Sequence, residues 1–209
     1  MADFSTLAAQ KPALLKGASP EQKTAINYFI PNQGCMGMFG KVKDEDYDAV
    51  VEGMLKSLNT YQKAIDKIGL DESELKEIPP ITLVGYEDSE FSKTTASGAY
   101  RSNKYSVTHL FFSATQVYMY QIIFNTMKNE KKERTEEYFY KDITNFSTST
   151  DSTEATSFGG GCSPQAKKVS IEVQRFALIV PGDKFSCATY GDIEQSVKAM
   201  KNKLREKKM

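Results

Sequence analysis

The spacing of apolar residues changes near residue 80, and this change constrains the fold more than any other feature of the sequence. Before it, apolar residues recur every three or four positions over 44–68, which predicts an amphipathic helix. After it, short runs alternate between apolar and polar residues, which predicts strands. We therefore expect an α+β protein with a helical N-terminal segment, 1–79, and a β domain, 80–209.

Start and stop signals place the helices of the N-terminal segment. Ser19 and Gln22 can cap each other around Pro20, which predicts a helix start. The expected helices span 20–29, 44–68 and 71–78. The sequence QGCMGMFGK predicts a plain connector, with a Met-rich contact loop as the alternative. The long apolar stripe favours docking on the chain's own β domain over a partner helix.

The alternating runs predict antiparallel strands joined mostly by short links. They are expected at 81–87, 104–113, 117–126, from 135 onward, 169–182 and 183–190. Two polar stretches, 88–103 and 128–134, predict a loop and a charged turn. In EEYFYKDITNFST neither alternating set is apolar throughout, which predicts a bulge or bend near Lys141 and Asp142, followed by an exposed edge strand or a loop.

The end of the chain predicts an amphipathic helix that begins at a cap on Asp192. Its apolar residues recur at steps of four, three and four, and the opposite face is rich in Lys. The stripe consists of Ile193, Val197, Met200 and Leu204. A helix of this length is marginal alone in water, so we expect the stripe to cover one end of the β domain.

Charge argues against a polyanionic partner. The formal net charge is +0, and residues 44–90 carry 13 acidic and 4 basic side chains. Residues 91–209 carry 18 basic and 12 acidic side chains, and acids interleave with most of the bases. We expect no nucleic-acid binding and weak or no membrane binding.

The sequence predicts neither catalysis nor a cofactor. Cys35, Cys162 and Cys187 are far apart, which predicts free thiols in a reducing cytoplasm, and no stretch suits a signal peptide or a membrane span. A zinc site needs more ligands than these and His109, the one histidine. His109 is expected to be structural, the glycines at 159–161 to form a loop, and Asp142 to bond within a turn.

The order of elements resembles the pleckstrin-homology-like barrel, in particular its bacterial members. The residues that carry the resemblance are VTHLFFSATQVYMY, EEYFYKDITNFST and FALIVPGDKFSCATYGDIEQSVKAMKNKL. The first is similar to an early hairpin of that fold, the second to a middle strand, and the third to the last hairpin and helix. The likeness spans residues 80–209, and it implies an antiparallel barrel capped by a C-terminal helix. The full chain also resembles uncharacterised bacterial proteins with such a helical segment first.

This resemblance implies a binding function without chemistry. We expect a non-enzymatic, cytoplasmic protein-interaction or assembly module that binds a protein partner or copies of itself. Membrane-binding members use basic residues at the first strand pair, where this chain has acids at 87–90 and only Lys93, Arg101 and Lys104 as candidate contacts for a ligand or partner. The alternatives are peripheral binding of anionic membrane through the C-terminal helix, and a small-molecule or enzymatic role in a cleft between the two parts.

Overall fold

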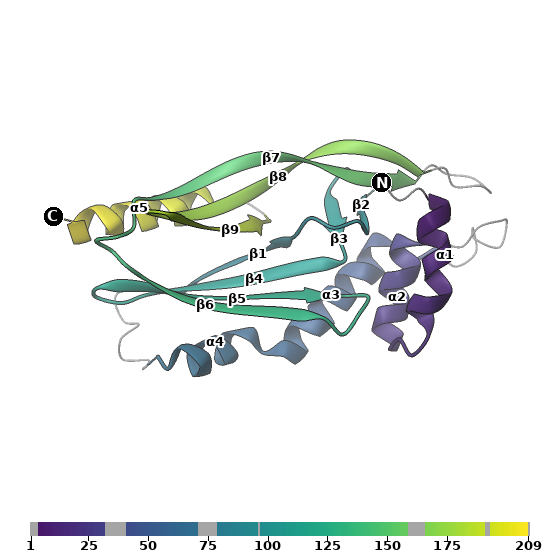
Figure 1. Ribbon diagram of the computed structural model, residues 1–209, viewed down its shortest axis with the longest axis horizontal. Coiled ribbons are helices and arrows are strands. Elements are labelled where there is room, and N and C mark those ends of the chain that lie inside the picture. The colour runs from purple at the N-terminus through teal and green to yellow at the C-terminus, as the bar shows by residue number, and fades with distance from the viewer. Residues whose placement is uncertain are drawn as a thin grey trace.

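The computed structural model describes residues 4–31, 41–70, 79–95, 97–158, 166–190 and 193–208. Within these ranges, helices precede the strands and one helix follows them (Figure 1). The helices are α1 (Phe4–Leu15), α2 (Pro20–Phe29), α3 (Asp44–Leu58), α4 (Thr60–Ile68) and α5 (Glu194–Lys208). The mixed α+β composition predicted from the sequence is confirmed.

The start of α2 is the predicted reciprocal cap. Ser19 Oγ accepts a hydrogen bond from the Gln22 amide at 3.2 Å, and Gln22 Oε1 accepts one from the Ser19 amide at 2.9 Å. Pro20 occupies the first turn, where its missing N–H costs nothing. Helix α1, which contains Pro12, was not predicted from the sequence.

The prediction of one continuous helix over 44–68 is wrong. Asn59 adopts the left-handed conformation (φ 43°, ψ 54°) and separates α3 from α4. Asn reaches this region more readily than most residues because its short side chain can bond locally. Gly69, with φ 72°, ends α4 as predicted. The predicted helix over 71–78 lies outside the described residues, and so does the predicted connector over 33–41 except for its last residue, Lys41.

The strands form two sheets instead of one closed barrel. Sheet one has the order β1-β4-β5-β6, all antiparallel. Its strands are β1 (Ile81–Tyr86), β4 (Lys104–Phe112), β5 (Gln116–Asn125) and β6 (Lys131–Phe139). The prediction that 128–134 is a turn is wrong from Lys131 onward, because this charged segment pairs with β5 as an edge strand.

Sheet two has the order β3-β2-β7-β8-β9 and is antiparallel except where β2 meets β7. Its strands are β2 (Ser92–Thr94), β3 (Tyr100–Ser102), β7 (Asn145–Phe158), β8 (Ala166–Val180) and β9 (Asp183–Thr189). The short strands β2 and β3 lie where the sequence predicted a loop. The predicted bend is confirmed: the Asp142 amide donates to the Phe139 carbonyl at 2.9 Å, and the chain crosses there from sheet one to sheet two.

The two sheets meet along β1 and β9. The Tyr190 amide donates to the Val84 carbonyl at 2.7 Å. A Cβ at Gly85 would lie 2.6 Å from the backbone carbonyl of Ala188, so only glycine allows this approach. The result is a half-barrel whose two sheets join along β1 and β9 (Figure 1). Strand β6 forms the other edge of sheet one.

Apolar side chains form one cluster on each face of sheet one. On the outer face, α2, α3 and α4 pack on β1, β4 and β5 around Tyr47, Phe111 and Tyr120, each of them 0% exposed. On the inner face, Leu110, Phe176 and residues of α5 fill the space between the sheets. The predicted docking of the acidic helices on the β domain is confirmed for the described residues 44–70.

The helix α5 lies against sheet two, at the opposite end of the molecule from α1 and α2 (Figure 1). Val197, Met200 and Leu204 are buried in the inner cluster, and Ile193 packs on it. The predicted stripe is therefore confirmed, and it is the burial of these side chains that holds a helix too short to stand alone.

Candidate functional site

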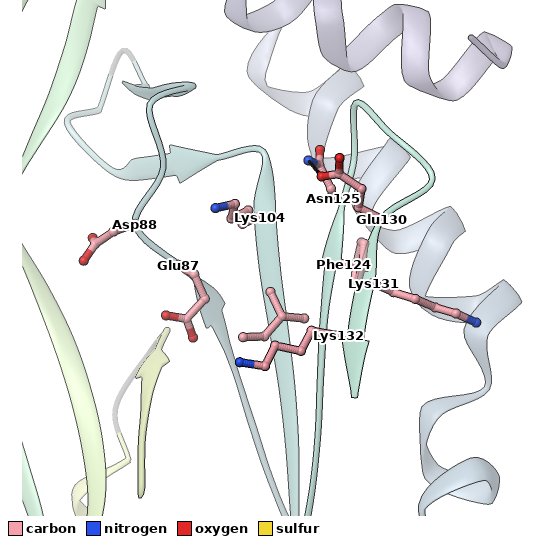
Figure 2. A pocket seen from close by; sticks show the side chains of 9 residues that line it. Glu87, Asp88, Lys104, Phe124, Asn125, Glu130, Lys131 and Lys132 are labelled. Carbon is pink, nitrogen blue, oxygen red and sulfur yellow. Dashed lines mark hydrogen bonds between the residues drawn. The ribbon is translucent and has the colours of Figure 1, made fainter. Parts of the chain in front are cut away.

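A pocket of about 410 Å³ opens where strands of sheet one end. The end of β1, the start of β4, the end of β5 and the start of β6 contribute its walls (Figure 2). Ile123 and Phe124 supply apolar surface, and charged side chains surround it. These charged residues are Glu87, Asp88, Lys104, Glu130, Lys131 and Lys132.

The two acids on β1's side of the pocket share one arginine within the fold. Arg175 Nη1 lies 3.4 Å from Glu87 Oε2, and its Nη2 lies 2.6 Å from Asp88 Oδ2. Glu87 also accepts a hydrogen bond from the Ala188 amide at 3.2 Å. These contacts hold the end of β1 against β8 and β9, so the acids act chiefly as structural anchors.

Two lysines give the pocket unpaired positive charge. Lys104 and Lys132 are exposed, and in the described part of the chain neither has a carboxylate within ion-pair distance. Lys132 stands beside Ile123 on the inner face of the sheet, since the two residues are cross-strand partners. The pocket thus offers cations and apolar surface to a bound group.

A second pocket, of about 290 Å³, lies on the helix side of the same turn. Met54 and Leu58 of α3 line it together with Asn129 and Lys131. It shares Phe124, Asn125, Glu130 and Lys131 with the first pocket. The β5–β6 turn therefore separates two hollows on opposite faces of the sheet.

Side-chain hydrogen bonds fix the β5–β6 turn. Asn125 Oδ1 accepts from the Met127 amide at 2.9 Å and from Asn103 Nδ2 at 3.0 Å. Its Nδ2 donates to Glu130 Oε2 at 3.0 Å. Because the turn is held at both ends, the position at which β6 begins is well defined.

The outer edge of β6 carries free backbone groups. The Asn125 amide donates to the Glu130 carbonyl, and the Tyr140 amide donates to the Thr115 carbonyl. The backbone N–H and C=O groups of the even-numbered residues of β6 therefore point toward β5. Hydrogen-bonded pairs alternate along an antiparallel ladder. The N–H and C=O groups of Lys131, Glu133, Thr135 and Glu137 therefore point away from the sheet, and among the described residues no strand pairs with this edge.

Helix α4 anchors β6 on the outer face of sheet one. Lys63 and Lys67 of α4 both pair with Glu133, the former at 3.2 Å. Hydrogen bonds from Lys67 and Lys63 lower the pKa of Glu133 to about 2, although partial burial opposes them. The carboxylate thus stays charged and ties the edge strand to the helix layer.

Lys93 lies inside the protein. It is 7% exposed, and its Nζ lies 3.4 Å from the centroid of the Tyr28 ring and 3.4 Å from the Tyr28 carbonyl. Burial lowers the pKa of Lys93 to about 8. The side chain joins α2 to sheet two, which leaves it little surface for a ligand.

Arg101 is also engaged within the fold. Its Nε and Nη2 donate to the two carboxylate oxygens of Asp48 at 2.8 and 3.2 Å, and its guanidinium lies 5.0 Å from the Tyr86 ring. Of the three contacts predicted from the sequence, Lys104 lines the first pocket. A ligand or partner role for Lys93, Arg101 and Lys104 stays a prediction.

His109 occupies a structural position. Its Nδ1 lies 2.9 Å from Thr82 Oγ1, and its Nε2 lies 3.0 Å from Thr60 Oγ1, so it connects β1 and α4. Burial lowers the pKa of His109 to about 4. In the described ranges, no group of three or more His, Cys, Asp or Glu side chains could hold a metal ion.

Other sequence candidates lie partly outside the described ranges. Cys187 is buried with a free thiol whose pKa burial raises to about 12, whereas Cys35, Cys162 and the glycines at 159–161 are not described. The place of Lys132 at the pocket and the open edge of β6 were not predicted from the sequence. The run of charged residues in KKERTEE was the available signal, because an edge strand that is solvent-exposed on both faces needs no apolar set.

Comparisons do not assign the chain to a known group. Among its described helices, none is long and apolar enough to cross a membrane. Searches against protein-family models, curated proteins and solved structures give no match for this chain.

Proposed function

We propose that this chain is a non-enzymatic protein-interaction module that receives an extended partner segment along the edge of β6. The observation that carries the proposal is the row of four outward-facing backbone positions on β6, with a pocket on each face of the sheet at the start of this strand. In strand addition, main-chain hydrogen bonds supply affinity, and pockets for alternate side chains supply specificity.

The charges on β6 are consistent with a selective edge. Charged residues on an edge strand discourage indiscriminate pairing, because a wrong partner meets like charges. The segment carries Lys131 and Lys132 near its start and Glu136 and Glu137 near its end. A partner strand must therefore present acids at one end and bases at the other.

We also propose that the chain has a pleckstrin-homology-like fold and lies in the cytoplasm. Strands in two antiparallel-rich sheets followed by a packed C-terminal helix support a pleckstrin-homology-like fold, and the free thiol of Cys187 supports a cytoplasmic location. The membrane alternative has less support, because the apolar stripe of α5 is buried and only its charged face remains for lipid. The first pocket keeps a small-molecule role open as a second candidate, with Lys104 and Lys132 as its cations.

A display experiment tests the proposal. Random extended peptides would be selected on the full chain and then measured by fluorescence anisotropy against two variants. Thr135→Pro removes one outward N–H without touching the bonds to β5, and Thr135→Ala keeps that N–H as the matched control. We expect selected peptides to bind the parent and the Ala variant and to lose at least about tenfold in affinity on the Pro variant. Equal binding to all three would refute strand addition at β6.

A further inference from the structure

We infer that the partner segment is β6 of a second copy of this chain, paired antiparallel about a twofold axis. This inference rests on the proposed function and specifies its partner. A twofold axis perpendicular to the sheet keeps each face on its own side, so position i must face a position of the same parity. The possible registers of β6 on itself are therefore few.

One register matches basic to acidic residues. When Arg134 lies opposite its own copy, Lys131 faces Glu137 and Lys132 faces Glu136. The twofold axis doubles each contact, which gives four cross-strand pairs of opposite charge. Lys132 and Glu136 occupy a non-hydrogen-bonded position between the copies, where facing side chains approach more closely.

Neighbouring registers bring like charges together. Centring the pairing on Thr135 places Glu133 opposite Glu137, and centring it on Glu133 places Lys132 opposite Arg134. In the favoured register the two Arg134 side chains face each other. Each already lies 2.7 Å from Glu136 Oε1 and 3.8 Å from Asp183 Oδ2 of its own chain, which offsets their repulsion.

The same register places the exposed ring of Phe139 near a pocket of the second copy. Phe139, at the end of β6, is 49% exposed and stands on the helix-side face. Extending the register places Phe139 opposite Asn129 of the second copy. Asn129 lines the pocket of about 290 Å³ that also contains Met54 and Leu58 on that face. Each copy therefore brings a ring to the mouth of the other copy's pocket.

Charge reversal provides the test, because each variant alone should self-associate weakly, whereas a mixture of the two variants should associate as the parent does. In the favoured register, residue 132 of each copy faces residue 136 of the other. In Lys132→Glu both of these contacts join two glutamates, and in Glu136→Lys both join two lysines. A mixture of the two variants restores opposite charges at both positions. We expect sedimentation equilibrium to show self-association of the parent, weakened about tenfold or more in each variant and recovered in the mixture.

Controls separate a lost interface from a lost fold. Lys201→Glu reverses a charge on α5, outside the register, and should leave self-association unchanged, and thermal melting should show all variants folded. Phe139→Ser should weaken the association with no loss of folding. A parent that stays monomeric at its highest soluble concentration, or a mixture that associates no better than its components, overturns the inference. Peptide binding that depends on Thr135 would then still support the proposed function.

Discussion

Sheet one has two edges, β1 and β6, and they differ in what their backbones contact. At β1 the backbone comes so close to β9 that Gly85 leaves no room for a Cβ, and Arg175 clamps Glu87 and Asp88 at its end. At β6, the outward backbone groups meet no other strand within the described residues. The difference separates two tasks: the closed edge holds the half-barrel together, and the open edge is available for another strand.

The interior behind the closed edge should be the most sensitive part of the molecule. Val197 is 5% exposed within the inner cluster. Val197→Asp removes a buried apolar side chain and buries an unpaired charge, which should cost about 4 kcal/mol or more. Thermal melting checks this against Lys201→Glu, which we expect to cost about half a kcal/mol or less. Equal melting temperatures for the two variants would mean that α5 is not held by its stripe.

The contact between β1 and β9 should come next. Gly85→Ala places a Cβ 2.6 Å from the backbone of Ala188, which cannot move aside as a side chain could. We expect a loss of about 3 kcal/mol, measured by urea unfolding. Gly53→Ala is the control, since a Cβ there meets no atom within 4 Å and alanine favours the helix. A Gly85 variant as stable as the parent would show that the two sheets do not meet as described.

Between the two edges, lowering the pH should destabilise the fold at His109, which contacts α4. The pKa of His109 is about 4 in the folded protein against 6.5 ordinarily, so between these values the unfolded state binds more protons. Stability is therefore lost as the pH falls through this range, by about 2 kcal/mol between pH 7 and 5. Urea unfolding of the parent and of His109→Asn measures the effect. The variant should show a smaller loss, and parallel pH profiles would contradict the assignment.

The sequence reveals the closed parts of the fold more clearly than the open edge. Burial leaves a periodic record, and the stripe of α5 and the alternation of β4 predicted their positions correctly. The start of β6 at Lys131 leaves no such record, because both of its faces are wet. The break at Asn59 depends on one backbone conformation that the helical spacing does not encode.

The candidate site could be predicted even less fully. Lys93 and Arg101 look like surface cations in the sequence, yet their partners, Tyr28 and Asp48, come from helices 65 and 53 residues away. The first pocket forms where strands of sheet one begin or end, and only the assembled sheet brings those ends together. Lys104 was named with Lys93 and Arg101 because the resemblance implies basic residues beside the first strand pair, and its role as a contact stays a prediction.

The open edge should tolerate change best of all. Thr135→Pro and Thr135→Ala alter a residue whose backbone N–H points to solvent, so each should shift the free energy of unfolding by about half a kcal/mol or less. Urea unfolding measured at low protein concentration checks this. A loss of several kcal/mol in the Pro variant would show that this N–H is already bonded within the chain.

Residue-resolved amide hydrogen exchange along β6 tests the central claim most directly. In dilute solution, we expect the amides of Glu133, Thr135 and Glu137 to exchange quickly, because they face away from β5, and those of Arg134 and Glu136 to exchange slowly. Raising the protein concentration should slow the odd-numbered set alone. Equal protection of both sets in dilute solution would contradict the account, since β6 would then have a partner on each side.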